Sequence, residues 1–184
     1  MLGLNLLWYY YSIDKIMIDQ QERSDIASWI VGFTDGEGCF SVSMFQNKTT
    51  KFGWQVFPEF VITQGMKSLP ALEVFRQYFQ CGKIYINKRY DNHHEHLYRY
   101  CVRMIEDLSA RVIPFFRTHN LYTAKQDDFE IFAEIVQMLL TKTHHTQDGL
   151  RFIATRIQAM NRKKPSVYLK SLETKRHAPH RLCG

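Results

Sequence analysis

A short segment near the N-terminus places two carboxylic acids between glycines. In the run Gly32–Phe40, Asp35 and Glu37 alternate with Gly36 and Gly38, directly after an apolar stretch that predicts a helix. A helix C-terminus carries partial negative charge, so carboxylates there are unfavourable unless a cation compensates for them. Because carboxylate and carbonyl oxygens are preferred ligands of Mg²⁺, the segment has the composition of a divalent-cation site. The alternative interpretation is an ordinary helix C-cap with solvated acids.

The glycines of this segment predict a close contact between two helices. Gly32 and Gly36 are four residues apart and therefore share one helix face. Each costs roughly 1 kcal/mol of helix propensity relative to alanine, and their shared face carries no side chain. A bare face of this kind lets the backbone of a second helix approach closely.

The same residues resemble the signature of a known family. Residues 30–38 lie over the motif of the LAGLIDADG homing endonucleases. Gly32, Asp35 and Gly38 match the motif outright, and Glu37 stands for its second acid. The resemblance implies that Asp35 supports the helix end, whereas Glu37 binds metal.

Two later segments extend the similarity over residues 25–161. Phe60–Gln64 resembles a strand end where the family keeps a glutamine near its active site, and residues 146–161 resemble a late helix of the family. The motif occurs once in this sequence, and the resemblance implies that single-motif members act as homodimers. We therefore expect two copies of the chain to pack on a two-fold axis through Gly32, Phe33 and Gly36.

Periodicity and turn signals predict an α+β fold with the element order αββαββα, extra C-terminal helices and an antiparallel sheet. The resemblance implies that this order is the family's core and that the sheet forms a DNA-binding saddle. Pro58 lies in the second expected strand and predicts an edge position or a bulge. Ser24 or Asp25 is expected to cap the first helix, and Gly82 to end the second. The expected helices cover residues 26–36, 68–80, 107–117, 125–140 and 146–161, and the strands cover 39–46, 54–64, 83–88 and 97–104. We divide the chain into an N-terminal extension (1–23), one endonuclease domain (24–161) and a basic tail (162–184).

The resemblance also implies a catalytic set. Glu37 of both subunits and the backbone carbonyl of Gly36 would hold Mg²⁺, or Mn²⁺ as a substitute, and Gln64 would position water near the scissile phosphate. Each subunit would cut one strand and leave short 3′ overhangs. A family lysine near the metal matches imperfectly: the strict position falls on Thr123, and we choose Lys125 because its long side chain reaches across a turn. A surface lysine at a helix start is the alternative for Lys125.

Polar side chains alternate along the expected strands, as a surface that reads base edges requires. A two-stranded ribbon fits the major groove of DNA, where Arg, Lys, Asn and Gln pair with bases, while other lysines meet phosphates. The expected DNA contacts are Ser41, Ser43, Asn47, Lys48, Lys51, Gln55, Lys83, Tyr85, Asn87, Lys88, Arg89, Arg99 and Arg103.

Charge and composition agree with a polyanionic partner. The net charge is +6, and residues 151–184 alone hold 9 basic and 1 acidic side chains; a solubilising tail is the alternative. The four cysteines lack metal-binding spacing, which favours reduced thiols in an intracellular protein. The histidines His93, His94 and His96 predict a solvated loop or a DNA-backbone contact rather than a metal site. The apolar Met1–Tyr11 is too short to span a bilayer, so we expect no membrane partner.

These observations predict an intron-encoded homing endonuclease that makes a metal-dependent double-strand break in a long pseudo-palindromic DNA target and so promotes intron mobility. Two alternatives stay open: an RNA maturase that assists splicing of its host intron RNA, and a DNA-binding regulator without catalysis. Such genes lie in organellar (chloroplast or mitochondrial), archaeal or phage genomes, and an organellar host is one expectation among these.

Overall fold

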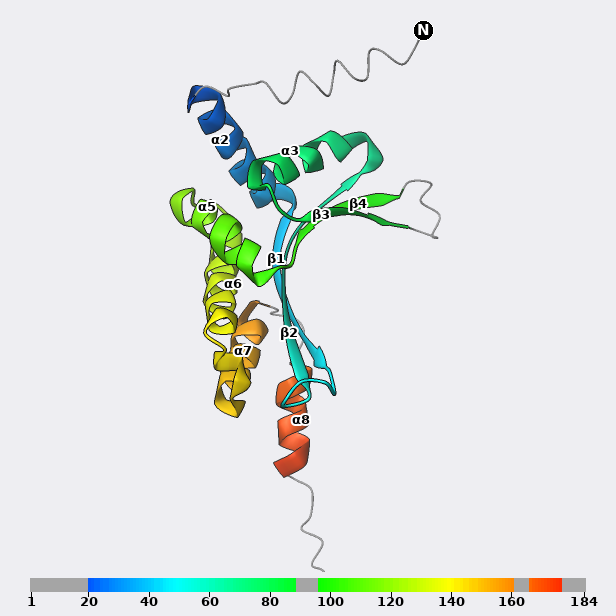
Figure 1. Ribbon diagram of the computed structural model, residues 1–184, viewed down its shortest axis with the longest axis vertical. Helices are drawn as coiled ribbons and strands as arrows, with labels where there is room; N and C mark the ends of the chain where they lie inside the picture. Colours follow the sequence, from blue (N-terminus) through cyan, green and yellow to red (C-terminus); the bar gives the residue numbers. More distant parts are fainter. Residues whose placement is uncertain (1–19, 89–95, 161–165, 177–184) are drawn as a thin grey trace, which may run out of the picture.

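The computed structural model describes residues 20–88, 96–160 and 166–176. Helix α2 (Gln20–Glu37) leads directly into the hairpin of β1 (Gly38–Gln46) and β2 (Trp54–Gly65). A 3₁₀ turn (Met66–Ser68) and α3 (Leu69–Phe79) connect this hairpin to β3 (Lys83–Asn87) and β4 (Leu97–Val102). The chain continues through α4 (Ile105–Asp107), a π-helical turn (Leu108–Val112), α5 (Ile113–Thr118), α6 (Lys125–Leu140), a 3₁₀ turn (Thr143–His145), α7 (Gln147–Met160) and α8 (Val167–Arg176). The predicted α+β fold is confirmed (Figure 1).

The four strands form one antiparallel sheet in the order β1-β2-β4-β3. The β1–β2 register runs without interruption from Gly38 opposite Ile62 to Gln46 opposite Trp54, so the bulge considered for Pro58 is absent from this pair. Strand β4 pairs with β2 only from Phe60 onward. Pro58 therefore lies where β2 has β1 as its only partner, as the edge interpretation predicted.

The helices cover one face of the sheet and form the core with it. Figure 1 shows α5, α6 and α7 along one side of β1 and β2. On that side Phe60 is fully buried, stacks on Phe40 with ring centroids 5.0 Å apart, and meets Phe116 edge-on at 5.6 Å. Burying each such ring contributes about 1.5–3 kcal/mol. This aromatic layer packs the helices against one face of β1 and β2 and leaves the other face of the sheet uncovered.

Several boundaries differ from the sequence-based expectation. Ser24 lies inside α2 and not at its start, and its carbonyl accepts a hydrogen bond from Ser28 Oγ at 3.0 Å. The left-handed residue that ends α3 is Gln80 (φ 50°) and not Gly82. Gly82 is nevertheless required, because its φ is +76° and a Cβ atom there would lie 2.8 Å from the carbonyl of Cys101. The helix expected over residues 107–117 begins at Ile105 and contains the π-helical turn.

The C-terminal tail contains a helix that the sequence pattern did not predict. Tyr168 in α8 is only 5% exposed, and its ring meets Trp54 of β2 edge-on at 5.3 Å. Arg89, His93 and His94 lie outside the described residues, as do most of the tail's remaining basic residues. In the part of the chain that the structure describes, no helix combines the length and apolarity needed to span a bilayer.

Candidate functional site

Lys125 closes the C-terminal end of α2. Its Nζ donates hydrogen bonds to three successive carbonyl oxygens, those of Thr34 at 3.0 Å, Asp35 at 2.8 Å and Gly36 at 3.0 Å. These are carbonyls that a helix leaves without partners, and a cation there is stabilised by the helix dipole. The first residue of α6 is thus fastened to the segment that carries both acids. Lys125 lies at the predicted position, and its catalytic role stays a prediction.

The carboxylate of Asp35 is fully engaged within the chain. It accepts hydrogen bonds from the backbone N–H groups of Tyr122 at 2.8 Å and Thr123 at 3.2 Å, and from Thr123 Oγ1 at 2.7 Å. Burial acts to raise the pKa of Asp35, but these hydrogen bonds outweigh it, so the pKa is lowered from its ordinary value. Asp35 therefore joins α2 to the loop before α6. Thr123, at the strict lysine position of the motif, serves as its partner.

Glu37 is the acid that remains available. It is the last residue of α2 and is exposed, and among the described residues no group forms a hydrogen bond or ion pair with its side chain. The next residue must be glycine, because a Cβ atom on Gly38 would lie 2.6 Å from Thr34 Cγ2 and 2.8 Å from the Thr34 carbonyl oxygen. This close approach turns the chain from α2 into β1 and leaves Glu37 at the surface.

One chain offers only part of a cation site. Glu37 and the Gly36 carbonyl are hard oxygen donors of the kind that Mg²⁺ binds, but Gly36 also accepts from Lys125. Within residues 20–88, 96–160 and 166–176, no three His, Cys, Asp or Glu side chains gather in a metal-binding group. Further oxygens would have to come from a second chain, from phosphate and from water.

Gln64 lies at the same end of the sheet as Glu37. Gly38, which follows Glu37, is the partner of Ile62, and Gln64 is two residues beyond Ile62, opposite Tyr98. Its side chain is half-buried and alternation places it on the helix-covered side. The fold thus brings the Gln64 and Glu37 segments together, as expected.

The face of α2 that carries Gly32 and Gly36 is open. Both glycines are exposed, and a Cβ atom at either would meet nothing within 4 Å. Phe33 differs, because its ring packs within the chain against Trp29 at 4.9 Å and Phe75 at 5.6 Å. The two glycines therefore have room for a second helix, whereas Phe33 is already partly used by the fold.

The predicted DNA-contacting residues of the strands share the face that the helices leave uncovered. The register sets Ser41 and Ser43 opposite Glu59 and Phe57. In the β3–β4 register, side chains on the same face are paired across the two strands. These pairs are Lys83–Cys101, Tyr85–Arg99 and Asn87–Leu97. At the β1–β2 turn, Asn47 Nδ2 donates to Gln55 Oε1 at 2.7 Å, and Lys48 and Lys51 are exposed. Lys88 is exposed as well.

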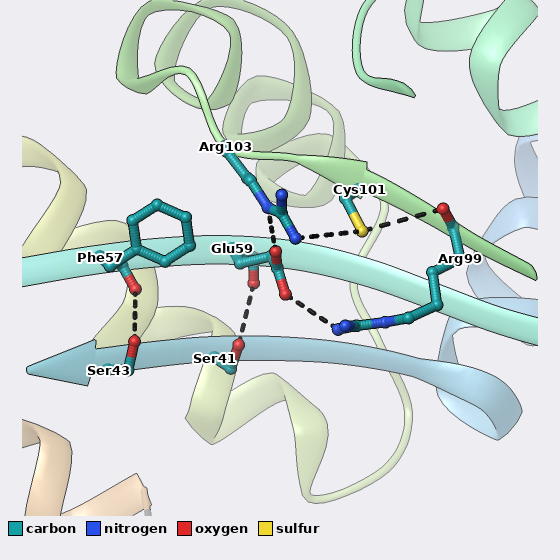
Figure 2. A network of polar contacts seen from close by, with 7 residues as sticks. All are labelled: Ser41, Ser43, Phe57, Glu59, Arg99, Cys101 and Arg103. Carbon is teal, nitrogen blue, oxygen red and sulfur yellow. Dashed lines mark hydrogen bonds and ion pairs between the residues drawn. The ribbon is translucent and has the colours of Figure 1, made fainter. Parts of the chain in front are cut away.

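Glu59 lies on the uncovered face, although the predicted set of DNA contacts does not include it. It is only 8% exposed, and one carboxylate oxygen accepts from Arg99 Nη2 at 3.0 Å while the other accepts from Arg103 Nε (Figure 2). Strand alternation sets Glu59 on the same face as Gln55 and Phe57, but a carboxylate is not expected on a surface that binds a polyanion. The signal in the sequence that could have found it is the pair of arginines four residues apart, Arg99 in β4 and Arg103 just after it, since two cations on one face call for an acid.

Comparisons with known proteins agree with this geometry. A family model described as LAGLIDADG endonuclease matches residues 30–136. The probable intron-encoded endonuclease 2 of Neurospora crassa is 34% identical over 134 residues, which cover 73% of this chain and 29% of that protein. The homing endonuclease I-ApeII of Aeropyrum pernix is 32% identical over 114 residues, covering 62% of this chain and 64% of the relative.

Solved structures extend the similarity to the fold. The homing endonuclease I-TnaI superposes with a TM-score of 0.70 at 36% identity, over 80% of this chain and 96% of the other. I-SmaMI bound to an uncleaved DNA target in the presence of calcium ions gives a TM-score of 0.71 at 31% identity, over 81% of this chain and 49% of the other. The chain spans less than a third of two Neurospora crassa relatives, 29% and 24% of their lengths.

Proposed function

Because the chain belongs to the LAGLIDADG endonuclease family, we propose that it is a homing endonuclease that cuts both strands of a DNA target and leaves 3′ overhangs. The observation that supports this most directly is the exposed carboxylate of Glu37, which has no partner among the described residues. It follows the Gly36 carbonyl that Lys125 Nζ contacts, at one end of a sheet with an uncovered polar face. Asp35 in the same segment is bound internally, so the two acids have separate roles.

Glu37 and the Gly36 carbonyl are the residues that would hold Mg²⁺, with Mn²⁺ as a substitute. When bound, the metal supplies charge stabilisation for the attacking water and the leaving 3′ oxygen of the phosphodiester. Lys125 Nζ contacts the Gly36 oxygen at 3.0 Å, so with a metal held by Glu37 and Gly36 the ammonium would be near the scissile phosphate and would stabilise its developing charge. Gln64, at the adjacent strand end, orients the water.

The sheet positions the DNA for this chemistry. The uncovered face carries Arg99, Arg103 and Lys83 among serine, tyrosine and asparagine side chains, the groups that pair with base edges and phosphates. Lys48 and Lys51 at the β1–β2 turn extend the same surface. The major groove is the site that fits a β-ribbon of this kind.

Two copies of the chain complete the site in this proposal. The open Gly32–Gly36 face of α2 lets the two helices approach, which brings both Glu37 residues to one axis. A two-fold dimer reads a pseudo-palindromic site. The intron-encoded relatives support an intron location for the gene. Among the possible hosts we propose an organellar genome, since one relative is named for intron 1 of ND4 in Podospora anserina.

A cleavage assay tests the proposal. The purified chain is incubated with a duplex copy of its host gene that lacks the intron, with Mg²⁺, with Mn²⁺ and with EDTA. We expect one cut in the presence of either metal, none with EDTA, and 3′ overhangs on sequencing of the ends. Specific binding to the host intron RNA without any cut in DNA would replace the proposal with the maturase. Specific duplex binding without cutting would replace it with the regulator.

A further inference from the structure

Glu59 places a buried negative charge in the middle of the face proposed to bind DNA. It lies in β2 opposite Ser41, whose Oγ donates to the Glu59 carbonyl oxygen at 3.4 Å. Both oxygens of its carboxylate are occupied, one by Arg99 Nη2 at 3.0 Å and the other by Arg103 Nε. Figure 2 shows the two guanidinium groups converging on this one side chain from β4 and its end.

Arg103 is held from further sides. Its guanidinium carbon lies 5.0 Å from the ring centroid of Tyr85 and 5.6 Å from that of Phe57, distances at which a cation is attracted to a ring. Its Nη2 also lies 3.9 Å from Cys101 Sγ. Four side chains from three strands therefore fix one arginine, although that arginine is 38% exposed.

The nitrogens used to hold Arg103 leave part of the guanidinium free to donate. A guanidinium has five N–H donors; Arg103 gives its Nε donor to Glu59 and one Nη2 donor to Cys101 Sγ. One N–H on Nη2 and two on Nη1 remain, and such a pair of donors matches O6 and N7 of guanine. Ordering a long side chain opposes binding, and in Arg103 much of this ordering is present before DNA arrives.

The carboxylate also has an opposing effect on general affinity. One negative charge offsets one of the two arginine charges, so this patch attracts any phosphate backbone less than two free arginines would. Since sequence-independent binding depends on phosphate neutralisation, Glu59 lowers it. Two effects therefore increase the ratio of specific to non-specific DNA binding: Arg103 is ordered before DNA binds, and the patch attracts phosphates less strongly.

We propose that Glu59 is a positioning residue that holds Arg103 for paired hydrogen bonds to one guanine in each half of the target and thereby determines specificity. The inference rests on the proposed function, because it requires that this face binds DNA.

The test selects binding sites from a library of randomised duplexes with wild type, Glu59→Gln and Arg103→Lys. Arg103→Lys should lose the preference for guanine at one position per half-site by on the order of 10-fold, since a lysine cannot make the paired contact. Glu59→Gln should weaken preference at the same position. On a random-sequence duplex it should bind more tightly, with a salt slope steeper by up to about one unit.

A matched control distinguishes the loss of any surface carboxylate from the loss of the carboxylate at position 59. Glu73→Gln removes a carboxylate from the surface pair Glu73–Arg76 on α3, which lies outside this face, and should leave selectivity and salt slope as in wild type. Thermal unfolding will show whether Glu59→Gln folds, and Tyr85→Leu is the second variant if it does not. Because Tyr85 is 42% exposed, we expect Tyr85→Leu to fold. Because it removes a ring that holds Arg103, it should weaken the preference for guanine at the same position.

The outcomes distinguish the two levels of the proposal. The proposed role of Glu59 would be overturned if folded Glu59→Gln kept the wild-type preference for guanine. It would also be overturned if Tyr85→Leu and Arg103→Lys both kept it. In either case the assignment as an endonuclease would stand. If wild-type protein enriches no sequence at all, the proposed function fails and this inference fails with it.

Discussion

Lys125 Nζ lies 3.0 Å from the carbonyl oxygen of Gly36. The same oxygen is the backbone ligand that we propose for the metal, so in the proposed complex this atom would also bind a catalytic cation. This relationship also explains how two acids are tolerated at a helix C-terminus. Lys125 and the N–H groups around Asp35 supply the positive charge that the helix end lacks.

Replacement of Lys125 by methionine tests this arrangement. The change leaves three carbonyls of α2 without their donor and should lower the free energy of unfolding by about 1–3 kcal/mol, measured by urea denaturation. Cleavage should fall as well, because the charge beside the phosphate is lost. Lys125→Arg retains the charge and should recover part of the stability. If Lys125→Met is as stable as wild type, the three hydrogen bonds do not fasten α6 to α2.

The stability of the fold should depend on pH through Asp35. Its hydrogen bonds hold its pKa below the ordinary value, so the carboxylate stabilises the folded state above the unfolded pKa of about 3.9. That contribution is lost as the pH falls through the lower, folded pKa. Asp35→Asn should be less stable than wild type at neutral pH, and the difference should shrink in acid. Urea midpoints at several pH values measure this; a constant difference would contradict it.

Gly32 tests the proposed dimer without disturbing the subunit. A side chain at Gly32 meets nothing within 4 Å in one chain, so Gly32→Leu should keep its thermal stability as a monomer but lose self-association in sedimentation equilibrium. Gly38→Ala is the contrasting variant. Its Cβ would lie 2.6 Å from Thr34 Cγ2, so it should destabilise the subunit itself. A Gly32→Leu dimer as tight as wild type would rule out this face as the interface.

The aromatic layer under the sheet should dominate the stability of the subunit. Phe60 has no exposed surface and contacts Phe40, Phe79 and Phe116. Phe60→Ala should therefore cost about 3–5 kcal/mol in urea unfolding. Phe45, on the opposite face, is 43% exposed, and Phe45→Ala should cost about 1 kcal/mol or less. Equal losses for the two variants would contradict this placement of the core.

Local patterns were enough to predict much of the fold. Alternation along residues 39–46 and helical spacing in residues 125–140 predicted elements that the structure contains, the latter with the same bounds. Alternation also predicted which strand residues share the uncovered face, since the register is continuous. The motif puts Thr123 at its strict lysine position, and only the reach of the side chain favoured Lys125. The bonds of Lys125 to α2 could not be predicted, because they join residues about ninety positions apart.

The remaining features depend on tertiary contacts. Glu59 meets Arg99 and Arg103 across 40 and 44 residues, a pairing that only the β2–β4 register creates. Helix α8 has a mixed charged sequence without a clear apolar stripe, and its Tyr168 is buried through tertiary contacts such as the one with Trp54. The start of α2 was placed too late because Ser24 resembles a cap, although the helix continues through it.

The most direct test of the account compares wild type with Glu37→Gln on the duplex copy of the host gene, measuring cleavage and binding in the same preparation with Mg²⁺ and with EDTA. The substitution removes a carboxylate that has no partner among the described residues, and glutamine keeps nearly the same size. We predict that wild type cuts the duplex at a single site, and that it does so only when metal is present. Glu37→Gln should bind that site with unchanged affinity and should not cut it. Metal-dependent cutting by Glu37→Gln at the wild-type rate would contradict the account.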